Sequence, residues 1–337
     1  MIGIAPQRGE PELPIDTGIA KMACSSRVKI VCEPVFQRGS RTSRRMTLTQ
    51  PQSSPKSVLE SIRSMLVLYG SVRSTPLARR AGRSLLDLPL VRGTILSHHL
   101  ENAQFCAQRF GLDSLQMRVI VDTESTAPID PPVSESGKVQ CQIEQDASPI
   151  RGVAGVLSDA TQGMDPDDYI IVSSGAQVYL ERLDDLVHAM AKKRADVTLV
   201  SSRDDSPVGV WLIRVGVLRS IKPVGYVDMK EQALESWKHD HLVRVVERPR
   251  AYVHPARSIS EYLDALRANA QGYGAGTTID EDPFREDWES SFSVAEPGAV
   301  VGDGAVLHDA VALNGSEIGR GAVVVRSVIC PGAKVMP

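Results

Sequence analysis

Short apolar runs alternate with amphipathic stretches along residues 61–270. Apolar runs bounded by polar or Gly/Pro residues predict buried strands, and apolar residues spaced three or four apart predict helices. Because strands alternate with helices, we expect the α/β class, with a mostly parallel sheet that helices cover on both faces. The expected strands are residues 65–69, 117–121, 169–172, 197–200, 208–213 and 241–246, and the expected helices are 95–110, 152–161, 183–194, 230–237 and 258–270.

Residues 293–337 carry a sixfold repeat that begins at Val294. Each hexad opens with an apolar residue, and a small residue stands four positions later as far as Ala322. This pattern is typical of a left-handed parallel β-helix, in which the opening residue points into a prism-shaped core. The seven hexads make little more than two coils. Since three repeats are usually needed for stability, we expect the coils to lean on the first domain or on another copy of the chain.

Two segments lack either pattern. Residues 1–60 are rich in Pro, Ser and Arg, and positions 37–57 contain five basic residues and no acidic one. This composition predicts a disordered basic extension, with an anion-binding arm and a start codon placed too early as open alternatives. Residues 271–292 are Gly-rich and then acidic, which predicts a linker. The expected division of the chain is therefore 1–60, 61–270, 271–292 and 293–337.

The composition excludes several classes of protein. The 337 residues are 42% hydrophobic and carry a formal charge of −3, which gives no electrostatic argument for nucleic acid or membrane binding. No apolar run approaches the ~18 residues of a membrane span, and no signal-peptide pattern opens the chain. The five cysteines form no C-x-x-C pair, so we expect a reducing, cytoplasmic location without a zinc or redox site. His98 and His99 are interpreted as structural or surface residues.

Four segments, taken in order, resemble the sugar-1-phosphate nucleotidyltransferases, such as mannose-1-phosphate guanylyltransferase and glucose-1-phosphate adenylyltransferase. Residues 151–200, from RGVAGVLSDA through YIIVSSGAQ to RADVTLV, are similar to the family's G-T-A-G-A helix, its G-D motif and the helix ending in A-D-V-T. Residues 209–218, 228–234 and 258–269 resemble its G-I-Y-V-F strand, its D-L-K-E helix and its closing T-P-E-D-Y helix. The resemblance covers residues 65–337. It implies a Rossmann-like nucleotidyltransferase domain followed by the β-helix.

The chain departs from the family where the chemistry requires particular residues. The resemblance implies a Gly-rich phosphate loop, basic residues at the transferred phosphate and two carboxylates that hold Mg²⁺. Here the loop at residues 69–79 reads YGSVRSTPLAR, without the glycine pair. The G-D motif reads Gly175-Ala176, and the second metal aspartate falls within residues 254–257, HPAR. Both metal carboxylates are therefore missing.

A reduced site remains. The resemblance implies Arg73 and Arg83 as retained anion contacts, and Asp122, at the end of an expected strand, is the third catalytic candidate. Each of the three also has a plain interpretation, as a solvated surface charge or a strand-end turn residue. No metal ligand is assigned, and Mg²⁺ is expected only if the protein is active through Asp122 or Gln177. The nucleotide-binding candidates are Gly70, Ser71, Gly152 and Gly175.

The sequence leaves several functions open. The missing carboxylates favour a catalytically impaired protein that binds a nucleotide or nucleotide sugar, or acts as a regulatory subunit, in a homo-oligomer or with an active relative. The alternative is an active enzyme with rearranged metal ligands that converts an NTP and a sugar 1-phosphate to an NDP-sugar and pyrophosphate. An acyltransferase that uses His308 as a base is a third hypothesis, and an interaction module with an unused pocket is a fourth.

Overall fold

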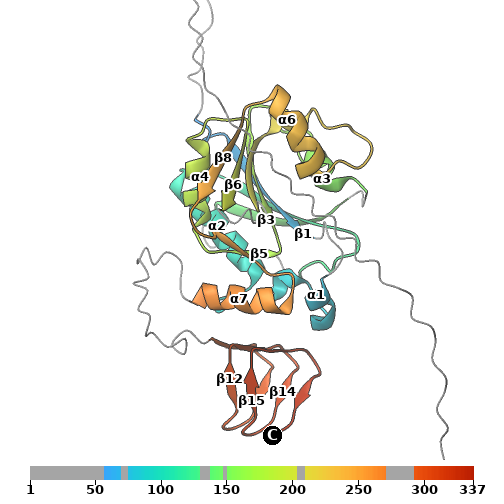
Figure 1. The fold of residues 1–337 in the computed structure, drawn as a ribbon, viewed down its shortest axis with the longest axis vertical. Coiled ribbons are helices and arrows are strands. Elements are labelled where there is room, and N and C mark those ends of the chain that lie inside the picture. The colour runs from blue at the N-terminus through green and yellow to red at the C-terminus, as the bar shows by residue number, and fades with distance from the viewer. Residues whose placement is uncertain (1–56, 70–74, 130–136, 147–149, 203–208, 271–291) are drawn as a thin grey trace, which may run out of the picture. The chain divides into compact units, whose positions relative to one another are not determined.

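The computed structural model (Figure 1) describes residues 57–69, 75–129, 137–146, 150–202, 209–270 and 292–337. The expected basic extension lies outside these residues except for positions 57–60, and the expected linker lies outside them except for Phe292. Residues Ser53–Pro337 form one compact unit. No helix in the described ranges is long and apolar enough to cross a membrane.

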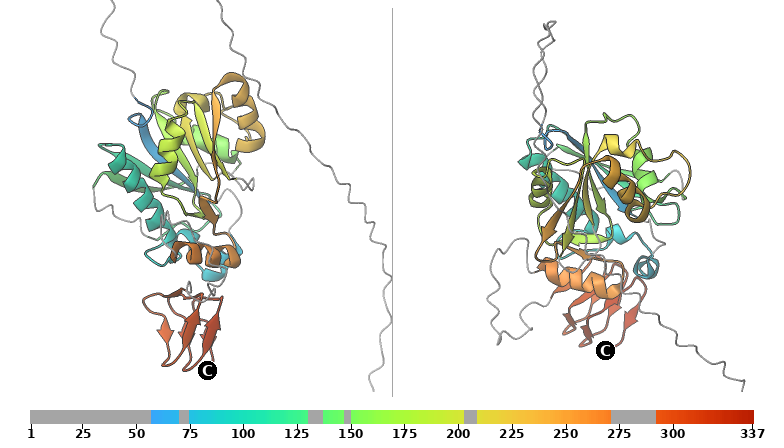
Figure 2. Two further views of the ribbon diagram at one scale, coloured as in Figure 1. Left: turned by 60° about the vertical axis from the view of Figure 1, so that its left-hand side comes forward. Right: turned by 45° about the horizontal axis from the view of Figure 1, so that its top comes forward.

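A seven-stranded mixed sheet forms the centre of this unit (Figures 1 and 2). Strand β7 runs antiparallel to its neighbours β4 and β6, and all other pairs in the sheet are parallel. The predicted α/β class with a mostly parallel sheet is confirmed. In spatial order the strands are β3 (Val139–Gln145), β2 (Leu115–Val121), β1 (Ile62–Tyr69), β4 (Tyr169–Ser174), β7 (Val210–Arg214), β6 (Val197–Ser202) and β8 (Val243–Arg248).

Helices pack on both faces of the sheet because successive strand residues point to opposite sides. In β1, Met65 and Val67 belong to one buried cluster and Leu66 to the other. The first cluster includes residues of α2 (Ile95–Arg109), α4 (Leu183–Ala191) and α7 (Ile259–Ala270). The second includes residues of α3 (Gly152–Ala160), α5 (Val215–Leu218), the π-helical turn η2 (Met229–Ala233) and α6 (Leu234–Asp240).

Several short elements were not predicted from the sequence. Helix α1 (Pro76–Ala81) begins where a loop was expected; Thr75 caps it and Pro76 starts it. Strand β3 has a polar, half-exposed pattern, VQCQIEQ, which hides it from a search for apolar runs. The 3₁₀ turn η1 (Leu85–Asp87) and the antiparallel pair β5 (Gln177–Tyr179) and β9 (Val253–Pro255) complete the α/β portion.

The C-terminal coils, residues 292–337, form three stacks of short parallel strands. Within a stack, each residue pairs with the residue 17 positions later in the next coil, as Val294 does with Val311 and Val306 with Val323. The strict sixfold repeat would place these partners 18 positions apart. The strands are β10 (Ser293–Ala295), β11 (Val300–Val301), β12 (Val306–His308), β13 (Ala310–Ala312), β14 (Glu317–Ile318), β15 (Val323–Val325), β16 (Val328–Ile329) and β17 (Lys334–Val335).

Because each coil has 17 residues and not the predicted 18, part of the predicted core of the coils is wrong. Val300 and Val306, expected inside, are 59% and 51% exposed, whereas Ile318 and Val324 are buried. One corner is closed by Asp309 in the first coil and Arg326 in the next, each with a positive φ of 49° or 46°. A left-handed residue turns the chain sharply there, so this side takes five residues instead of six. Since a slip of one residue reverses the side to which a strand residue points, part of the expected core faces outward.

The coils also contact the α/β portion directly. Phe292, Val311 and Leu313 belong to the large buried cluster that contains α2, α4 and α7. The Arg267 guanidinium on α7 binds the Asp309 carboxylate. Of the two supports expected from the sequence, the first domain or another copy of the chain, the structure shows the first.

Candidate functional site

A cavity of about 260 Å³ lies at the carboxyl ends of β1 and β4, where open α/β sheets bind ligands. We call it the strand-end cavity. Leu68 of β1, Ser173 and Ser174 of β4, and Ala176 and Gln177 beyond them line it on one side. The remaining lining residues come from β4, from the start of α3, from β7 and the residue before it, from η2 and its N-cap, and from β9 and the residues after it. They are Val172, Val153, Gly209, Trp211, Asp228, Met229, Lys230, Val253, Pro255 and Arg257.

A hydrogen-bonded chain fixes the polar floor of the strand-end cavity. The Gln177 side-chain amide donates to Ser173 Oγ at 2.9 Å and to the Gly209 carbonyl at 3.2 Å. The Ser173 hydroxyl lies 2.5 Å from the Tyr179 hydroxyl. Ser173, Gln177 and Tyr179 are all buried. Because every member has a partner, the Gln177 amide is held in one orientation.

Two buried histidines contact Tyr179 and Gly175, next to this polar floor. His98 Nε2 accepts a hydrogen bond from the Tyr179 backbone N–H at 3.0 Å, and its ring stacks on the Tyr179 ring. His99 Nε2 lies 3.3 Å from the Gly175 carbonyl, to which it donates. Burial lowers the pKa of His98 to about 3 and that of His99 to about 4. Both imidazoles are therefore neutral at pH 7 and support the β4–β5 turn, as the structural interpretation of the pair expected.

Charged side chains stand at the rim of the strand-end cavity. Asp228 caps η2: its Oδ1 accepts hydrogen bonds from the backbone N–H groups of Lys230 and Glu231 at 2.7 and 2.8 Å. Lys230 and Arg257 are exposed, and Asp228 is half-buried. Among the described residues that line this cavity, Asp228 is the single carboxylate. These described residues give the rim two cations and one anion.

The two segments where the resemblance expects metal carboxylates meet in this cavity. Strand β5 pairs with β9 so that Gln177 lies opposite Pro255. The Ala256 backbone N–H donates to the Ala176 carbonyl at 3.1 Å. Ala176, Pro255 and Arg257 all line the cavity, and none of them offers an oxygen ligand to a metal from its side chain. Among the described residues, no group of three or more His, Cys, Asp or Glu side chains could hold a metal ion.

The candidates chosen from the sequence are scattered. Gly70, Ser71 and Arg73 lie outside the described residues. Arg83 is directed to the C-terminal coils, where its Nη2 lies 2.7 Å from Glu296 Oε1. Asp122 does stand at the end of β2, but its Oδ1 accepts from the backbone N–H groups of Glu124 and Ser125 at 2.8 and 2.7 Å, as in a strand-end turn.

The two glycine candidates lie next to the strand-end cavity. Gly152 has φ +69° at the start of α3, and a Cβ there would lie 2.5 Å from the Val227 carbonyl oxygen. Gly175 is packed on Tyr69, where a Cβ would lie 3.0 Å from the Tyr69 Cβ. Both glycines are thus required for close backbone packing. Their neighbours Val153 and Ala176 are the residues that line the cavity.

Sequence reasoning missed Lys230 and Arg257 as site residues. Lys230 lies within the segment that resembles the D-L-K-E helix, and Arg257 lies within the segment inspected for a lost carboxylate. Lys230 corresponds to the lysine of that motif, which is a signal that the sequence does contain. For Arg257 the signal is a basic residue in a segment expected to carry a metal-binding carboxylate.

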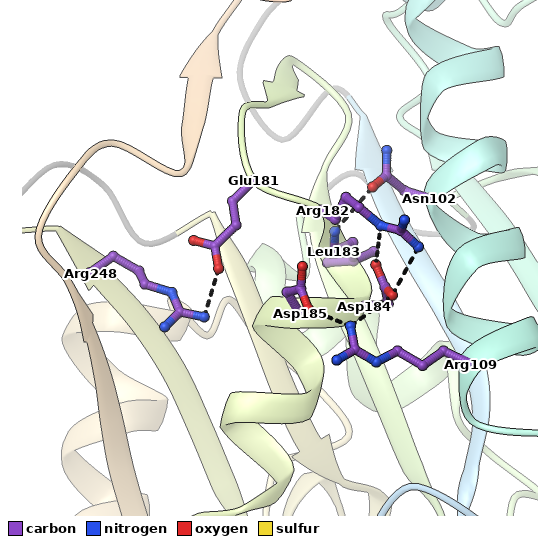
Figure 3. Close-up of polar contacts among 8 residues, drawn as sticks. All are labelled: Asn102, Arg109, Glu181, Arg182, Leu183, Asp184, Asp185 and Arg248. Atoms are coloured by element: carbon purple, nitrogen blue, oxygen red, sulfur yellow. Dashed lines mark hydrogen bonds and ion pairs between the residues drawn. The ribbon is translucent and has the colours of Figure 1, made fainter. Parts of the chain in front are cut away.

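A second polar cluster joins α2 to the start of α4, and Figure 3 shows its members. Asp184 accepts from Arg109 at 3.0 Å and from Arg182 at 3.0 and 3.1 Å, and its side chain is 1% exposed. Burial raises the pKa of Asp184, but the two guanidinium groups outweigh this effect and hold it below its usual range. Arg182 also lies 4.2 Å from the centre of the Phe105 ring. Charges are balanced within this cluster, which indicates a structural role.

Comparison with known proteins gives only distant matches. No family model matches the chain, and no curated protein matches it. One similar solved structure is described as a glucose-1-phosphate thymidylyltransferase from Bacillus anthracis in complex with sucrose, with 12% identity and a TM-score of 0.45, covering 62% of this chain and 94% of the other. Another is a homologue of Mycobacterium tuberculosis rv0371c from Mycobacterium sp. strain JC1, with 17% identity and a TM-score of 0.40, covering 63% and 98%.

Proposed function

We propose that this protein is a sugar-1-phosphate nucleotidyltransferase-like protein that binds a nucleotide or nucleotide sugar and is catalytically impaired. The sequence resemblance and the α/β fold support this class. The single observation that carries the proposed impairment is the meeting of Ala176 with residues 254–257 in the strand-end cavity, without a carboxylate from either segment. The proposed role is that of a binding or regulatory subunit.

The physical reason lies in the chemistry of phosphoryl and nucleotidyl transfer. The reacting phosphates carry several negative charges, and catalysis depends on positioning them and neutralising that charge. Mg²⁺ is usually held by one or two carboxylates together with the substrate phosphates. Asp228 is the one carboxylate among the described residues of the strand-end cavity, and two backbone N–H groups already occupy its Oδ1. Binding can persist in such a site after turnover is lost.

An active enzyme with rearranged ligands is the alternative proposal. Gln177 and Asp228 both line the strand-end cavity and are the groups that favour it, since each offers an oxygen atom. In that case Mg²⁺ would be required, and the reaction would release pyrophosphate. The assay below separates this alternative from the impaired protein.

We also propose that the C-terminal coils form a left-handed parallel β-helix that joins copies of the chain. The three stacks of parallel strands support this architecture. Five valines on strands β11, β12 and β15 are exposed, by 40% to 68%: Val300, Val301, Val306, Val323 and Val325. Exposed apolar residues gathered on adjacent short strands are typical of a protein interface. A second copy, or an active relative with the same coils, would cover them.

The proposed function is tested by thermal unfolding and by turnover. The purified protein is heated with NTPs and nucleotide sugars, each with Mg²⁺ and with EDTA. Pyrophosphate release is followed in a parallel assay that contains each NTP together with a sugar 1-phosphate. A ligand at 100 times its Kd adds about 2.7 kcal/mol, enough to raise Tm by several degrees. We expect a shift for at least one nucleotide or nucleotide sugar and no pyrophosphate release. Mg²⁺-dependent release would establish the active enzyme instead, and no shift with any ligand would refute the binding role.

A further inference from the structure

We propose that a basic pocket at the amino ends of β1 and β6 binds the acidic segment 280–289 of a second copy of the chain. The pocket has a volume of about 490 Å³, and we call it the amino-end pocket. Residues 57–59, before β1, line one side. The end of α4 and the residues beyond it line the other, with His188, Ala191, Lys192 and Arg194. This inference goes beyond the proposed function, because it adds an interface outside the coils and the strand-end cavity.

The polar side chains of the amino-end pocket are basic and unpaired. Lys192 and Arg194 are exposed, and His188 is half-buried. Among the described residues, none of these three side chains has an ion-pair or hydrogen-bond partner, and no described lining residue is acidic. The Glu60 carboxylate, beyond the lining, accepts from the Ser57 backbone N–H at 3.1 Å. The three basic groups are therefore available to the carboxylates of another molecule.

The backbone at Arg194 indicates that its side chain has a use. Arg194 follows the end of α4 and has a positive φ of 46°. Glycine adopts this left-handed conformation without steric cost, and it is the residue usually found after a helix that ends in this way. A role for the guanidinium in binding an acidic partner accounts for an arginine at a position that favours glycine.

The amino-end pocket also has an apolar part. Val58 and Leu59 are half-buried and pack against the large buried cluster, and Ala191 is buried. All three also line the pocket. A large apolar side chain bound there would be removed from water. The pocket therefore fits a segment that combines carboxylates with large apolar side chains.

The chain contains a segment of this kind between α7 and the coils. Residues 280–289, DEDPFREDWE, comprise six acidic residues, one arginine, one proline and two aromatic residues, Phe284 and Trp288. The segment lies outside the described residues. Blocks of like charge are often interaction segments, and aromatic side chains supply much of the binding energy at protein interfaces. In charge and in apolar content, the segment is complementary to the amino-end pocket.

The topology favours a second copy as the source of the segment. Helix α7, after which the segment follows, comes after β9, and β9 pairs with β5 just beyond the carboxyl end of β4. The amino-end pocket lies at the opposite ends of the strands, where β1 begins (Figures 1 and 2). A second copy is not held by this separation. Two copies that exchange their segments reciprocally form a closed dimer.

Binding is tested first with a fluorescent peptide of residues 278–291, titrated into the full chain and followed by anisotropy. We expect saturable binding that weakens about fivefold or more when NaCl is raised from about 0.05 M to about 0.5 M. Lys192→Gln/Arg194→Gln should weaken binding about tenfold or more, because it removes two charge-assisted contacts. Arg80→Gln/Arg92→Gln, which removes two exposed cations outside the pocket, should leave the Kd unchanged.

Two altered peptides separate the charge of the segment from its apolar content. One has Asn or Gln in place of the six acidic residues, and the other carries Phe284→Ala and Trp288→Ala. We expect each to bind about tenfold more weakly than the native peptide. Equal binding of the neutral peptide, or an unchanged Kd in the Lys192→Gln/Arg194→Gln protein, would overturn the inference.

Charge reversal tests whether the occupant comes from a second copy. We expect the Lys192→Glu/Arg194→Glu chain and the Glu286→Lys/Asp287→Lys chain each to sediment as a smaller species than the wild type. A mixture of the two has opposite charges at both contacts and should regain the wild-type sedimentation. If each reversed chain sediments like the wild type, or if the mixture regains nothing, the segment of a second copy does not occupy the pocket.

Two controls separate this interface from the rest of the protein. Denaturant unfolding of each variant establishes that a loss of binding is not a loss of fold. The Val306→Glu/Val323→Lys chain, altered only in the coils, should bind the peptide like the wild type. Weaker binding by this chain would show that the coils, and not the amino-end pocket, receive the segment. Nucleotide-sugar binding does not enter these measurements, so their failure leaves the proposed function unchanged.

Discussion

The Arg83 guanidinium lies 2.7 Å from the Glu296 carboxylate and thereby joins the α/β portion to the first of the C-terminal coils. Both side chains are largely buried, at 19% and 12% exposure. The second oxygen of Glu296 accepts from the Asn314 backbone N–H at 2.7 Å, so this carboxylate also ties together two successive coils. Arg83 was a candidate anion contact in the sequence, and its charge is instead used within the fold.

Loss of either partner should destabilise the protein without changing ligand binding. We expect Arg83→Gln and Glu296→Gln each to cost about 2 kcal/mol of unfolding free energy, since each leaves a buried charge without its partner. The double variant should cost less than the sum of the two. Denaturant unfolding of the four proteins in the cycle measures this coupling. A fall in sugar-phosphate affinity for Arg83→Gln at unchanged stability would restore Arg83 as a site residue.

Asp122→Asn should be nearly silent. The Asp122 Oδ1 atom accepts from two backbone N–H groups, and an asparagine carbonyl oxygen can accept the same two hydrogen bonds. We expect a change in unfolding free energy of less than about 1 kcal/mol and no change in ligand affinity. An active enzyme that holds Mg²⁺ through Asp122, as the sequence left open, predicts a loss of turnover for this variant. Pyrophosphate release and calorimetry of the Asp122→Asn protein therefore distinguish the two proposals.

The strands and helices were predicted well where one period dominates the sequence. The apolar run at 65–69 lies within β1, and the amphipathic stretches at 95–110 and 258–270 correspond to α2 and α7. The register of the coils could not be predicted, because Asp309 and Arg326 close a corner in a left-handed conformation that neither residue type signals strongly. Each coil is therefore one residue shorter than three hexads, and a search for a repeat of six residues does not detect this.

Part of the candidate site could be predicted from the sequence, and part could not. The resemblance indicated the segments around Ala176 and residues 254–257, and the pairing of β5 with β9 brings them together. Arg83 could not be excluded from the sequence, since its partner Glu296 is more than 200 positions away. Lys230 and Arg257 meet only through the tertiary fold. That both line one cavity follows from the fold and could not be predicted from either segment alone.

Stability should fall between pH 7 and pH 5 because of His98 and His99. Their pKa values are lowered to about 3 and about 4 in the folded protein, whereas an unfolded histidine titrates near 6.5. The unfolded state therefore takes up protons first as the pH falls below 6.5, and the stability present above that value is lost toward the folded pKa values. For two such groups the loss at pH 5 is roughly 4 kcal/mol.

Denaturant unfolding at several pH values measures this loss. His98→Gln and His99→Gln should each flatten the pH dependence by about half, even if each lowers the stability at pH 7. His254→Gln, which changes a half-buried histidine outside this pair, is the matched control. An unchanged slope in both histidine variants would show that other groups govern the acid sensitivity.

The outward valines of the coils should determine the assembly of the protein. Val306 and Val323 are directly opposite each other on β12 and β15. The double variant Val306→Glu/Val323→Lys makes this surface polar and keeps an attractive pair across the strands. We expect the variant to sediment as a smaller species than the wild-type protein. Arg320→Gln, at an 81% exposed side chain on the same coils, should sediment like the wild type. A wild-type protein that is monomeric at all concentrations would contradict the proposed interface.

The most direct test of a metal-free binding site compares the affinity for one nucleotide sugar in EDTA and in Mg²⁺. The nucleotide sugar with the largest thermal shift is titrated into the full chain in both buffers, and the heat of any reaction is checked by product analysis. We expect the two Kd values to agree within about twofold and the ligand to be recovered intact. A Kd at least tenfold lower in Mg²⁺ would contradict metal-free binding. Cleavage of the ligand to an NTP and a sugar 1-phosphate, after pyrophosphate is added in Mg²⁺, would show that the protein is an active enzyme.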